Sequence, residues 1–310
     1  MGSYGGEIFW GIVSAFVAFL LGLAWERLTQ LAVNYRARRF WRPLIAEKMS
    51  VVLGRFRDLP GFEASGVIGA GDNIALKHLA DYFIRIGFKR FTVLYNDQFG
   101  WNDVTEVSPL KGNLILIGGP DANRLTRDVL ERVPLGIEFL EVSPEYLRSV
   151  RGEVARPVPL LPLLRRRTLG GALRAVTRQR PPKVVSLKPE WRIPVFLDKV
   201  DNKLHGPRME TDGLVRDCGV VIRCPNPFNP TREVMIFCGS YGFGTWAAVQ
   251  YTQSKEFLDR VPKRTRYLEC VLTVEVVRET PHNIRVELLR PLEVGAPVPE
   301  ARIIVPRIVT

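Results

Sequence analysis

An uncharged apolar segment near the N-terminus constrains this chain more than any other feature. Residues 8–25 (IFWGIVSAFVAFLLGLAW) are eighteen consecutive positions without a charged side chain. As a helix with a rise of about 1.5 Å per residue, this segment spans about 27 Å, close to the hydrocarbon thickness of a bilayer. Trp10 and Trp25 lie near its two ends, where indole rings favour the membrane interface. We therefore expect a single transmembrane helix that anchors the chain in the lipid bilayer through residues 8–25.

The charges around this segment argue against a cleaved signal peptide. A signal peptide begins with a basic region, whereas residues 1–7 contain Glu7 and neither Lys nor Arg. Positive charges follow the segment instead, beginning at Arg27. The positive-inside rule then predicts a single-pass protein of the cell membrane, with its N-terminus outside and its C-terminal domain in the cytoplasm. A buried core helix and a cleaved signal remain the alternatives.

The chain is basic, with 44 Lys and Arg against 32 Asp and Glu and a net charge of +12. No recognised nucleic-acid-binding motif accompanies this charge, so we expect no nucleic-acid partner. Anionic lipid headgroups are the nearer polyanion, and each cation near the membrane surface contributes about 1 kcal/mol. A solvated basic surface is the alternative. The expected contacts to anionic headgroups are Arg36, Arg38, Arg39 and Arg42.

Short apolar strands alternate with helical segments after residue 48. The expected strands are residues 49–56, 91–95, 113–117 and 137–142, and the expected helices are residues 72–86 and 121–133. This alternation is typical of a mostly parallel, doubly wound α/β sheet. The later expected strands are residues 219–223 and 233–238, followed by a helix from about 245 to 261. Residues 267–278 and 283–289 alternate with period two, which predicts a C-terminal β-hairpin and hence a mixed sheet.

Three glycine-bearing loops precede the expected helices. Glycines let the backbone approach a ligand, and the free N–H groups at a helix N-terminus attract anions. Because the ends of parallel strands meet at one sheet edge, we expect these loops to form one ligand pocket. A tight strand-to-helix turn is the alternative at each loop, with Asp72 as an ordinary helix N-cap. The expected ligand-binding residues are Gly69, Gly71, Gly118, Gly119, Asn123, Gly239, Ser240, Gly242, Gly244 and Thr245.

Two of these loops carry a family resemblance. The GGPDAN segment at residues 118–123 and the GSYGFGTWAAV segment at residues 239–249 resemble uncharacterised prokaryotic Rossmann-like proteins carrying GGPxxN and GxxGTxxAV motifs. The resemblance covers residues 50–142 and 213–262. It implies a Rossmann-like sheet and one site shared by Gly118, Gly119, Asn123, Gly244 and Thr245.

The expected fold is therefore α/β, with a single transmembrane helix before a doubly wound, mixed Rossmann-like sheet that ends in a hairpin. Residues 1–48 form the anchor and a basic juxtamembrane helix, and residues 49–150 form the first half of the sheet domain. Residues 151–212 are read as a basic Pro/Arg-rich insertion or linker, because eight arginines and one glutamate lie between 151 and 180. Residues 213–310 form the second half with the hairpin.

Few residues suggest catalysis. Cys218, Cys224, Cys238 and Cys270 show no Cys-x-x-Cys spacing, so we expect neither a metal site nor a cofactor. A glycosidic-bond-cleaving enzyme needs a carboxylate in the pocket, and the candidates are Glu63 and Asp72.

Three functions are consistent with this sequence. The first is a membrane-anchored cytoplasmic sensor or effector that binds a small anionic, nucleotide-like ligand through the glycine loops and assembles as a homo-oligomer. The second is a nucleotide hydrolase or glycosidase that uses Glu63 or Asp72. The third is a structural subunit of a membrane assembly, in which the glycine loops are only turns.

Overall fold

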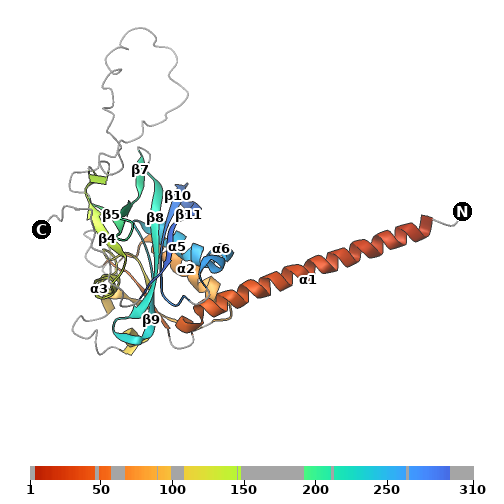
Figure 1. Ribbon diagram of the computed structural model, residues 1–310, viewed down its shortest axis with the longest axis horizontal. Coiled ribbons are helices and arrows are strands. Elements are labelled where there is room, and N and C mark those ends of the chain that lie inside the picture. Colours follow the sequence, from red (N-terminus) through yellow and green to blue (C-terminus); the bar gives the residue numbers. More distant parts are fainter. Residues whose placement is uncertain are drawn as a thin grey trace, which may run out of the picture.

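A long N-terminal helix, α1 (Tyr4–Ile45), leads into an α/β domain built around a mixed sheet (Figure 1). The computed structural model describes residues 4–45, 49–56, 67–88, 90–98, 108–144, 146–147, 192–210, 213–262 and 265–293. The arginine-rich part of the expected insertion, residues 151–180, lies outside the described residues.

The main sheet has the strand order β11-β10-β8-β9-β3-β1-β2, and β7 pairs with β8 beside this path. Strands β9, β3, β1 and β2 run parallel to one another, while β8, β10 and β11 pair antiparallel with their neighbours. The strand bounds are β1 (Met49–Leu53), β2 (Thr92–Tyr95), β3 (Asn113–Ile117), β7 (Arg208–Glu210), β8 (Gly213–Asn226), β9 (Asn229–Gly239), β10 (Leu268–Val277) and β11 (Thr280–Pro291).

This topology confirms a mixed α/β sheet, but it does not confirm the doubly wound Rossmann-like arrangement. The physical reason lies in the short connections of the second half. Only residues 227–228 separate β8 from β9, and strands joined by so short a turn pair antiparallel. The same holds for the predicted hairpin of β10 and β11, whose turn residues Arg278 and Glu279 both have positive φ, as tight hairpin turns require.

A second, three-stranded sheet extends the domain beyond what the sequence suggests. It consists of β4 (Ile137–Val142), β5 (Ile193–Asp198) and β6 (Lys203–His205), in that order and all antiparallel. The expected strand at residues 137–142 therefore exists, but it does not join the main sheet. The sequence assigned residues 192–210 to the insertion or linker. In the structure these residues instead contain three strands: β5 and β6 belong to the small sheet, and β7 pairs with β8 of the main sheet.

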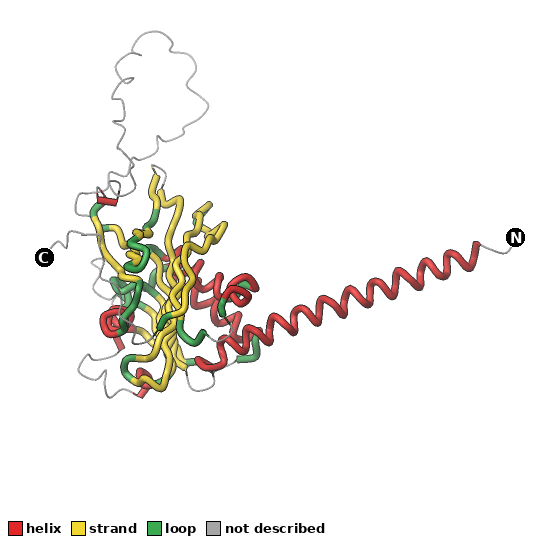
Figure 2. The backbone as a smooth tube through the Cα atoms, in the orientation of Figure 1, coloured by secondary structure: helices red, strands yellow, loops and turns green. Residues whose placement is uncertain are grey.

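Helices cover one face of the main sheet, and α3 with the small sheet covers the other (Figure 2). Side chains such as Val51 and Phe237 pack under the first layer, and their neighbours Val52 and Ile236 pack under the second. The helix bounds are α2 (Ala70–Arg85), α3 (Arg124–Arg132), α5 (Gly242–Thr252) and α6 (Lys255–Arg260), with 3-10 turns at Asn96–Gln98 and Ser108–Lys111. The helix expected at 245–261 is thus two helices, because Ser254 caps a new one by accepting a hydrogen bond from the Phe257 N–H.

The C-terminal turns of α1 pack in the core of the domain, whereas its N-terminal part lies outside the domain. Its last turns are core, since Trp41 is fully buried and Asn113 donates hydrogen bonds to the Pro43 and Leu44 carbonyls, both at 3.0 Å. Its apolar segment projects away from the domain, with Trp10 and Trp25 68% and 70% exposed. This helix is long and apolar enough to span a membrane, and no part of its most apolar stretch is buried within the described domain.

We expect Trp41→Ala to destabilise the domain by about 3–5 kcal/mol, because it empties a fully enclosed aromatic site between α1, α2 and β9. Trp25→Ala removes the same side chain from an exposed position and should leave the domain unchanged. Urea denaturation of the full chain in detergent micelles measures the free energy of unfolding of each variant, with hydrogen exchange of β8 and β9 as the probe. Equal effects of the two substitutions would contradict the packing described here.

Candidate functional site

A pocket of about 430 Å³ lies where the parallel strands β1, β3 and β9 end. The loop after β3, the loop after β9 and the first turns of α2 and α5 surround it, so the structure brings together the three glycine-bearing segments. Its lining residues are Phe56, Gly69, Ala70, Gly71, Asp72, Ile74, Gly119, Asp121, Ala122, Gly239, Ser240, Tyr241, Gly242, Phe243, Thr245 and Glu279.

Direct backbone contact between α2 and α5 shapes one wall of this pocket. A Cβ atom on Gly71 would collide with the Gly242 backbone, and one on Gly242 would lie 2.9 Å from the Gly71 Cα. Such a separation is too short for any side chain. Glycine at both positions therefore lets the N-termini of the two helices meet at the pocket.

Asp217 on β8 lies buried behind the glycine loop after β9 and holds it by hydrogen bonds, a role that the sequence analysis missed. Its Oδ1 accepts hydrogen bonds from the N–H groups of Cys218 and Tyr241 at 2.8 and 3.1 Å, and its Oδ2 accepts one from Gly244 at 2.6 Å. Complete burial raises the pKa of Asp217 to about 7, while these three N–H donors act in the opposite direction. A carboxyl group of the protein therefore already occupies much of the cradle that the glycine loop was expected to offer an anion.

Asp72 lies within the first turn of α2, and the N-cap of this helix is Gly69, three residues earlier. The side chain of Asp72 is buried and hydrogen-bonded to that of Thr245. Burial raises the pKa of Asp72 to about 6; the Thr245 hydrogen bond lowers it, and the nearby charge of Asp121 raises it. Glu63, the other candidate carboxylate, lies outside the described residues.

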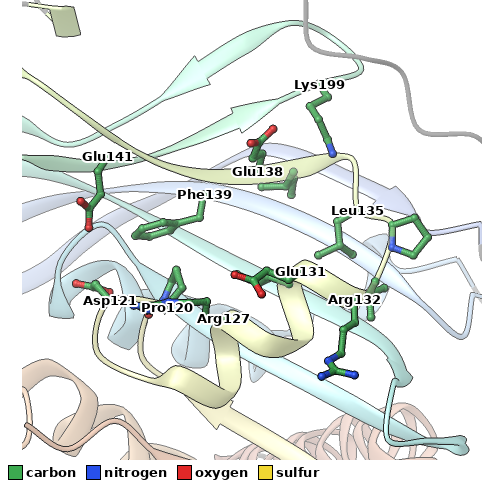
Figure 3. Close-up of a pocket in the computed structure, with 14 residues that line it drawn as sticks. Pro120, Asp121, Arg127, Glu131, Arg132, Leu135, Glu138, Phe139, Glu141 and Lys199 are labelled. Atoms are coloured by element: carbon green, nitrogen blue, oxygen red, sulfur yellow. Dashed lines mark hydrogen bonds between the residues drawn. The ribbon is translucent and has the colours of Figure 1, made fainter. Parts of the chain in front are cut away.

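Asp121 adds a second carboxyl group to the pocket lining, and burial also raises its pKa. Asp121 lines a neighbouring groove of about 840 Å³ as well, which runs between α3 and β4 (Figure 3). In that view Asp121 lies at one end of the groove and Arg132 lies toward the other. The pocket and the groove therefore adjoin at Asp121.

Ser240 lines the pocket, and its hydroxyl group is buried and has no hydrogen-bond partner among the described residues. Neither Gly69 nor Tyr241, the N-cap residues of α2 and α5, supplies a capping side-chain hydrogen bond. A buried hydroxyl without a partner costs free energy, so such a group is expected to meet a ligand or water. Beside the pocket, the Ser240 side chain therefore has hydrogen-bonding capacity that the described residues leave unused.

Three of the predicted ligand-binding residues do not line the pocket. Asn123 is the N-cap of α3: its Oδ1 accepts from the Leu125 N–H at 3.1 Å, and its Nδ2 donates to the carbonyl groups of Val52 and Ile117. Gly118 has a φ of +106° and lies beside Asp72, and Gly244 packs against the Cys218 carbonyl. Their positions fit a role in loop geometry rather than direct contact.

The four cysteines are buried, and burial raises the pKa of Cys224 and Cys270 to about 12, which keeps these thiols protonated and unreactive. Within the described ranges, no group of three or more His, Cys, Asp or Glu side chains is placed to hold a metal ion. Comparison of the chain with protein-family models, curated proteins and solved structures found no match. The chemistry of the site therefore has to be argued from its own residues.

We expect Gly71→Ala to destabilise the domain by about 1–3 kcal/mol and to push α2 away from α5, because its methyl group meets the Gly242 backbone. Gly69→Ala is the matched control: its methyl group would meet only the end of the Asp72 side chain at 3.3 Å, and we expect a loss of about 1 kcal/mol or less. Thermal unfolding of the full chain in detergent compares the two. Equal stability of both variants would show that the helices do not meet as described.

Stability should fall as the pH rises from about 4 to about 6, because folded Asp72 keeps a proton that the unfolded chain has lost. The raised pKa of Asp72 corresponds to a loss of about 2–3 kcal/mol over this range. Asp72→Asn removes the titrating group and should flatten the pH profile by this amount, while Asp81→Asn, at an exposed position of the same helix, should not. Urea denaturation at several pH values provides the measurement, and identical slopes for all three proteins would refute the assignment.

Proposed function

We propose that this chain is a membrane-anchored ligand-binding protein whose α/β domain takes a small, nucleotide-like ligand in the pocket between α2, α5 and the loop after β3. The observation that carries this proposal is the buried, unpartnered hydroxyl of Ser240, a residue that lines a pocket walled by two helix N-termini. Backbone N–H groups at such termini favour phosphate or other anionic groups.

The charge of the lining refines the ligand class. Asp72, Asp121 and Glu279 line the pocket, and the lining formed by the described residues contains neither Lys nor Arg. Carboxylates accept hydrogen bonds from sugar hydroxyl groups, as the acidic residue of dinucleotide sites does for ribose. A nucleotide-like molecule matches both features, with its sugar against Asp121 and Glu279 and its phosphate against the backbone N–H groups that begin α2.

In this proposal α1 crosses the cell membrane once, with the N-terminus outside and the domain in the cytoplasm, as the arginines after the apolar segment favour. The protein then acts as a sensor or effector, and ligand binding alters the assembly of anchored subunits into a homo-oligomer. An anchored domain with a ligand pocket supports this role by analogy of architecture.

A pocket-filling substitution tests the proposal. Ile74 lines the pocket, and Ile74→Trp should fill it and abolish binding of adenosine 5′-monophosphate. Ile84→Trp makes the same change on the same helix, at an exposed position outside the pocket, and should bind as the unsubstituted chain does. Native mass spectrometry of the full chain in detergent first checks for a retained nucleotide-sized mass. Isothermal titration calorimetry in the same detergent then measures the binding of adenosine 5′-monophosphate to each variant.

The same titration with adenosine separates the contribution of the phosphate from that of the sugar and base. If the chain retains no ligand mass and binds neither adenosine nor its monophosphate, the nucleotide proposal is overturned and the structural-subunit alternative gains. If Ile74→Trp and Ile84→Trp bind equally, the ligand lies elsewhere in the protein.

A second candidate function is cleavage of a nucleotide's glycosidic bond, and the paired carboxyl groups of Asp72 and Asp121 favour it. A carboxyl group with a pKa near 6 keeps enough protons near neutral pH to protonate a leaving base, and a second carboxylate can activate water. Asp72→Asn should then abolish release of free adenine from the monophosphate while binding persists. Unchanged adenine release would exclude Asp72 as the acid.

A further inference from the structure

An arginine-lined hollow of about 760 Å³ lies where the last turns of α1 pass α6 and β8. We propose that this hollow binds the phosphate headgroup of an acidic glycerophospholipid in the leaflet that α1 leaves. The inference rests on the proposal that α1 spans a bilayer, but it is independent of the nucleotide pocket. The lining residues are Tyr35, Arg36, Arg39, Phe40, Pro43, Arg223, Leu258, Asp259, Val261, Pro262, Thr265 and Arg266.

Four guanidinium groups line this hollow, and they come from three separate parts of the chain. Arg36 and Arg39 lie on α1, Arg223 lies on β8, and Arg266 lies two residues before the start of β10. Arg36 forms an ion pair with Asp259 on α6. Within the part of the chain that the structure describes, exposed Arg39 forms no ion pair with a carboxylate.

An ion-pair network around the buried side chain of Glu233 holds two of these arginines in place. Arg223 donates from Nε to Glu233 Oε2 at 2.8 Å and from Nη1 to the Phe40 carbonyl at 2.8 Å, and Arg266 Nε donates to Glu233 Oε1 at 2.6 Å. One glutamate therefore serves two arginines. With Asp259 included, four positive groups meet two negative groups, so the hollow carries a surplus of two positive charges that complements an acidic headgroup.

The hollow also lies close to the exposed apolar part of α1, as a site for a lipid headgroup requires. The exposed apolar surface of α1 continues past Trp25 to Leu28 and Leu31, which are 61% and 64% exposed. Arg36 follows Leu31 by about 8 Å along the helix axis. Side chains on a helix lean toward its N-terminus, so Arg36 and Arg39 lean back toward the membrane.

The hollow also contains the apolar surface that a lipid requires. Phe40, Leu258 and Val261 line it beside the arginines, and exposed Tyr35 lies at the edge, where aromatic rings favour the membrane interface. Figure 1 shows α6 beside the base of α1, on the side of the domain from which the apolar segment extends. This combination of fixed cations and apolar side chains suits the phosphate and glycerol parts of a phospholipid.

The test compares two variants that lose the same charge. Arg36→Gln/Arg39→Gln removes two arginines from the hollow, and Lys77→Gln/Arg85→Gln removes two exposed cations of α2 that do not line it. We expect the first variant to bind phosphatidylglycerol about thirty-fold more weakly than the unsubstituted full chain, and the second to bind it nearly as well. Native mass spectrometry of the detergent-solubilised chain, titrated with phosphatidylglycerol or phosphatidylcholine, measures lipid retention.

Four results would overturn the inference. In the first, both variants lose the same affinity for phosphatidylglycerol, and in the second, the unsubstituted chain retains the two lipids equally. In the third, the unsubstituted chain binds glycerol phosphate as tightly as the lipid, and in the fourth, it forms a dimer that only the Arg36→Gln/Arg39→Gln variant loses. The last two results indicate a soluble anion and a second copy of the chain, respectively. Incorporation into nanodiscs of phosphatidylcholine tests the anchor separately, because failure there removes the anchor proposal itself. Binding of adenosine monophosphate should be the same in both variants, so failure of the nucleotide proposal is distinguishable.

Discussion

The contact between Gly71 and Gly242 determines how α2 and α5 lie on the sheet. Because neither residue has a side chain, the two helices begin at the same edge with their backbones touching. This arrangement brings two positive dipole ends together, each equivalent to about half an elementary charge. Asp72 in the first turn of α2 and Asp217 beneath the first turn of α5 lie where they offset this unfavourable interaction.

Burial of these carboxyl groups has a consequence for the site. Asp217 takes the N–H groups of Tyr241 and Gly244, so the loop after β9 has fewer donors for a phosphate than its glycine content suggests. Burial nevertheless outweighs the donors and raises the pKa of Asp217 and Asp72 toward neutrality. The pocket therefore combines helix N-termini, which favour anions, with acidic groups, which favour hydroxyl or amine donors. A ligand with both kinds of group fits it best.

The sequence predicted the elements around the pocket better than the sheet that holds them. Glycine loops follow apolar strands locally, so their meeting at one edge could be inferred without the rest of the chain. Asp217 could not be placed in this way, because it reaches the loop only through the antiparallel pairing of Gly219 with Gly239. An acidic residue directly before the apolar run from 218 to 222 was its only sequence signal. The Rossmann-like order was inferred from alternation and from the resemblance of two loops, and neither determines how the two later hairpins pair.

Helix α1 and the pocket meet opposite ends of the same strand. Asn113 begins β3 and holds the end of α1, whereas Gly118 and Gly119 follow β3 at the pocket. The strand is about 16 Å long, so a ligand in the pocket does not touch α1. Any influence of a molecule in the pocket on α1 would have to pass through the sheet or through α2, whose C-cap carbonyl at Ile86 accepts a hydrogen bond from Arg38 at 2.8 Å. Arg38 thus connects α2, which begins at the pocket, with α1, which leaves the domain. The sequence predicts Arg38 as a contact to lipid headgroups, and in the structure the same side chain also makes this hydrogen bond within the protein.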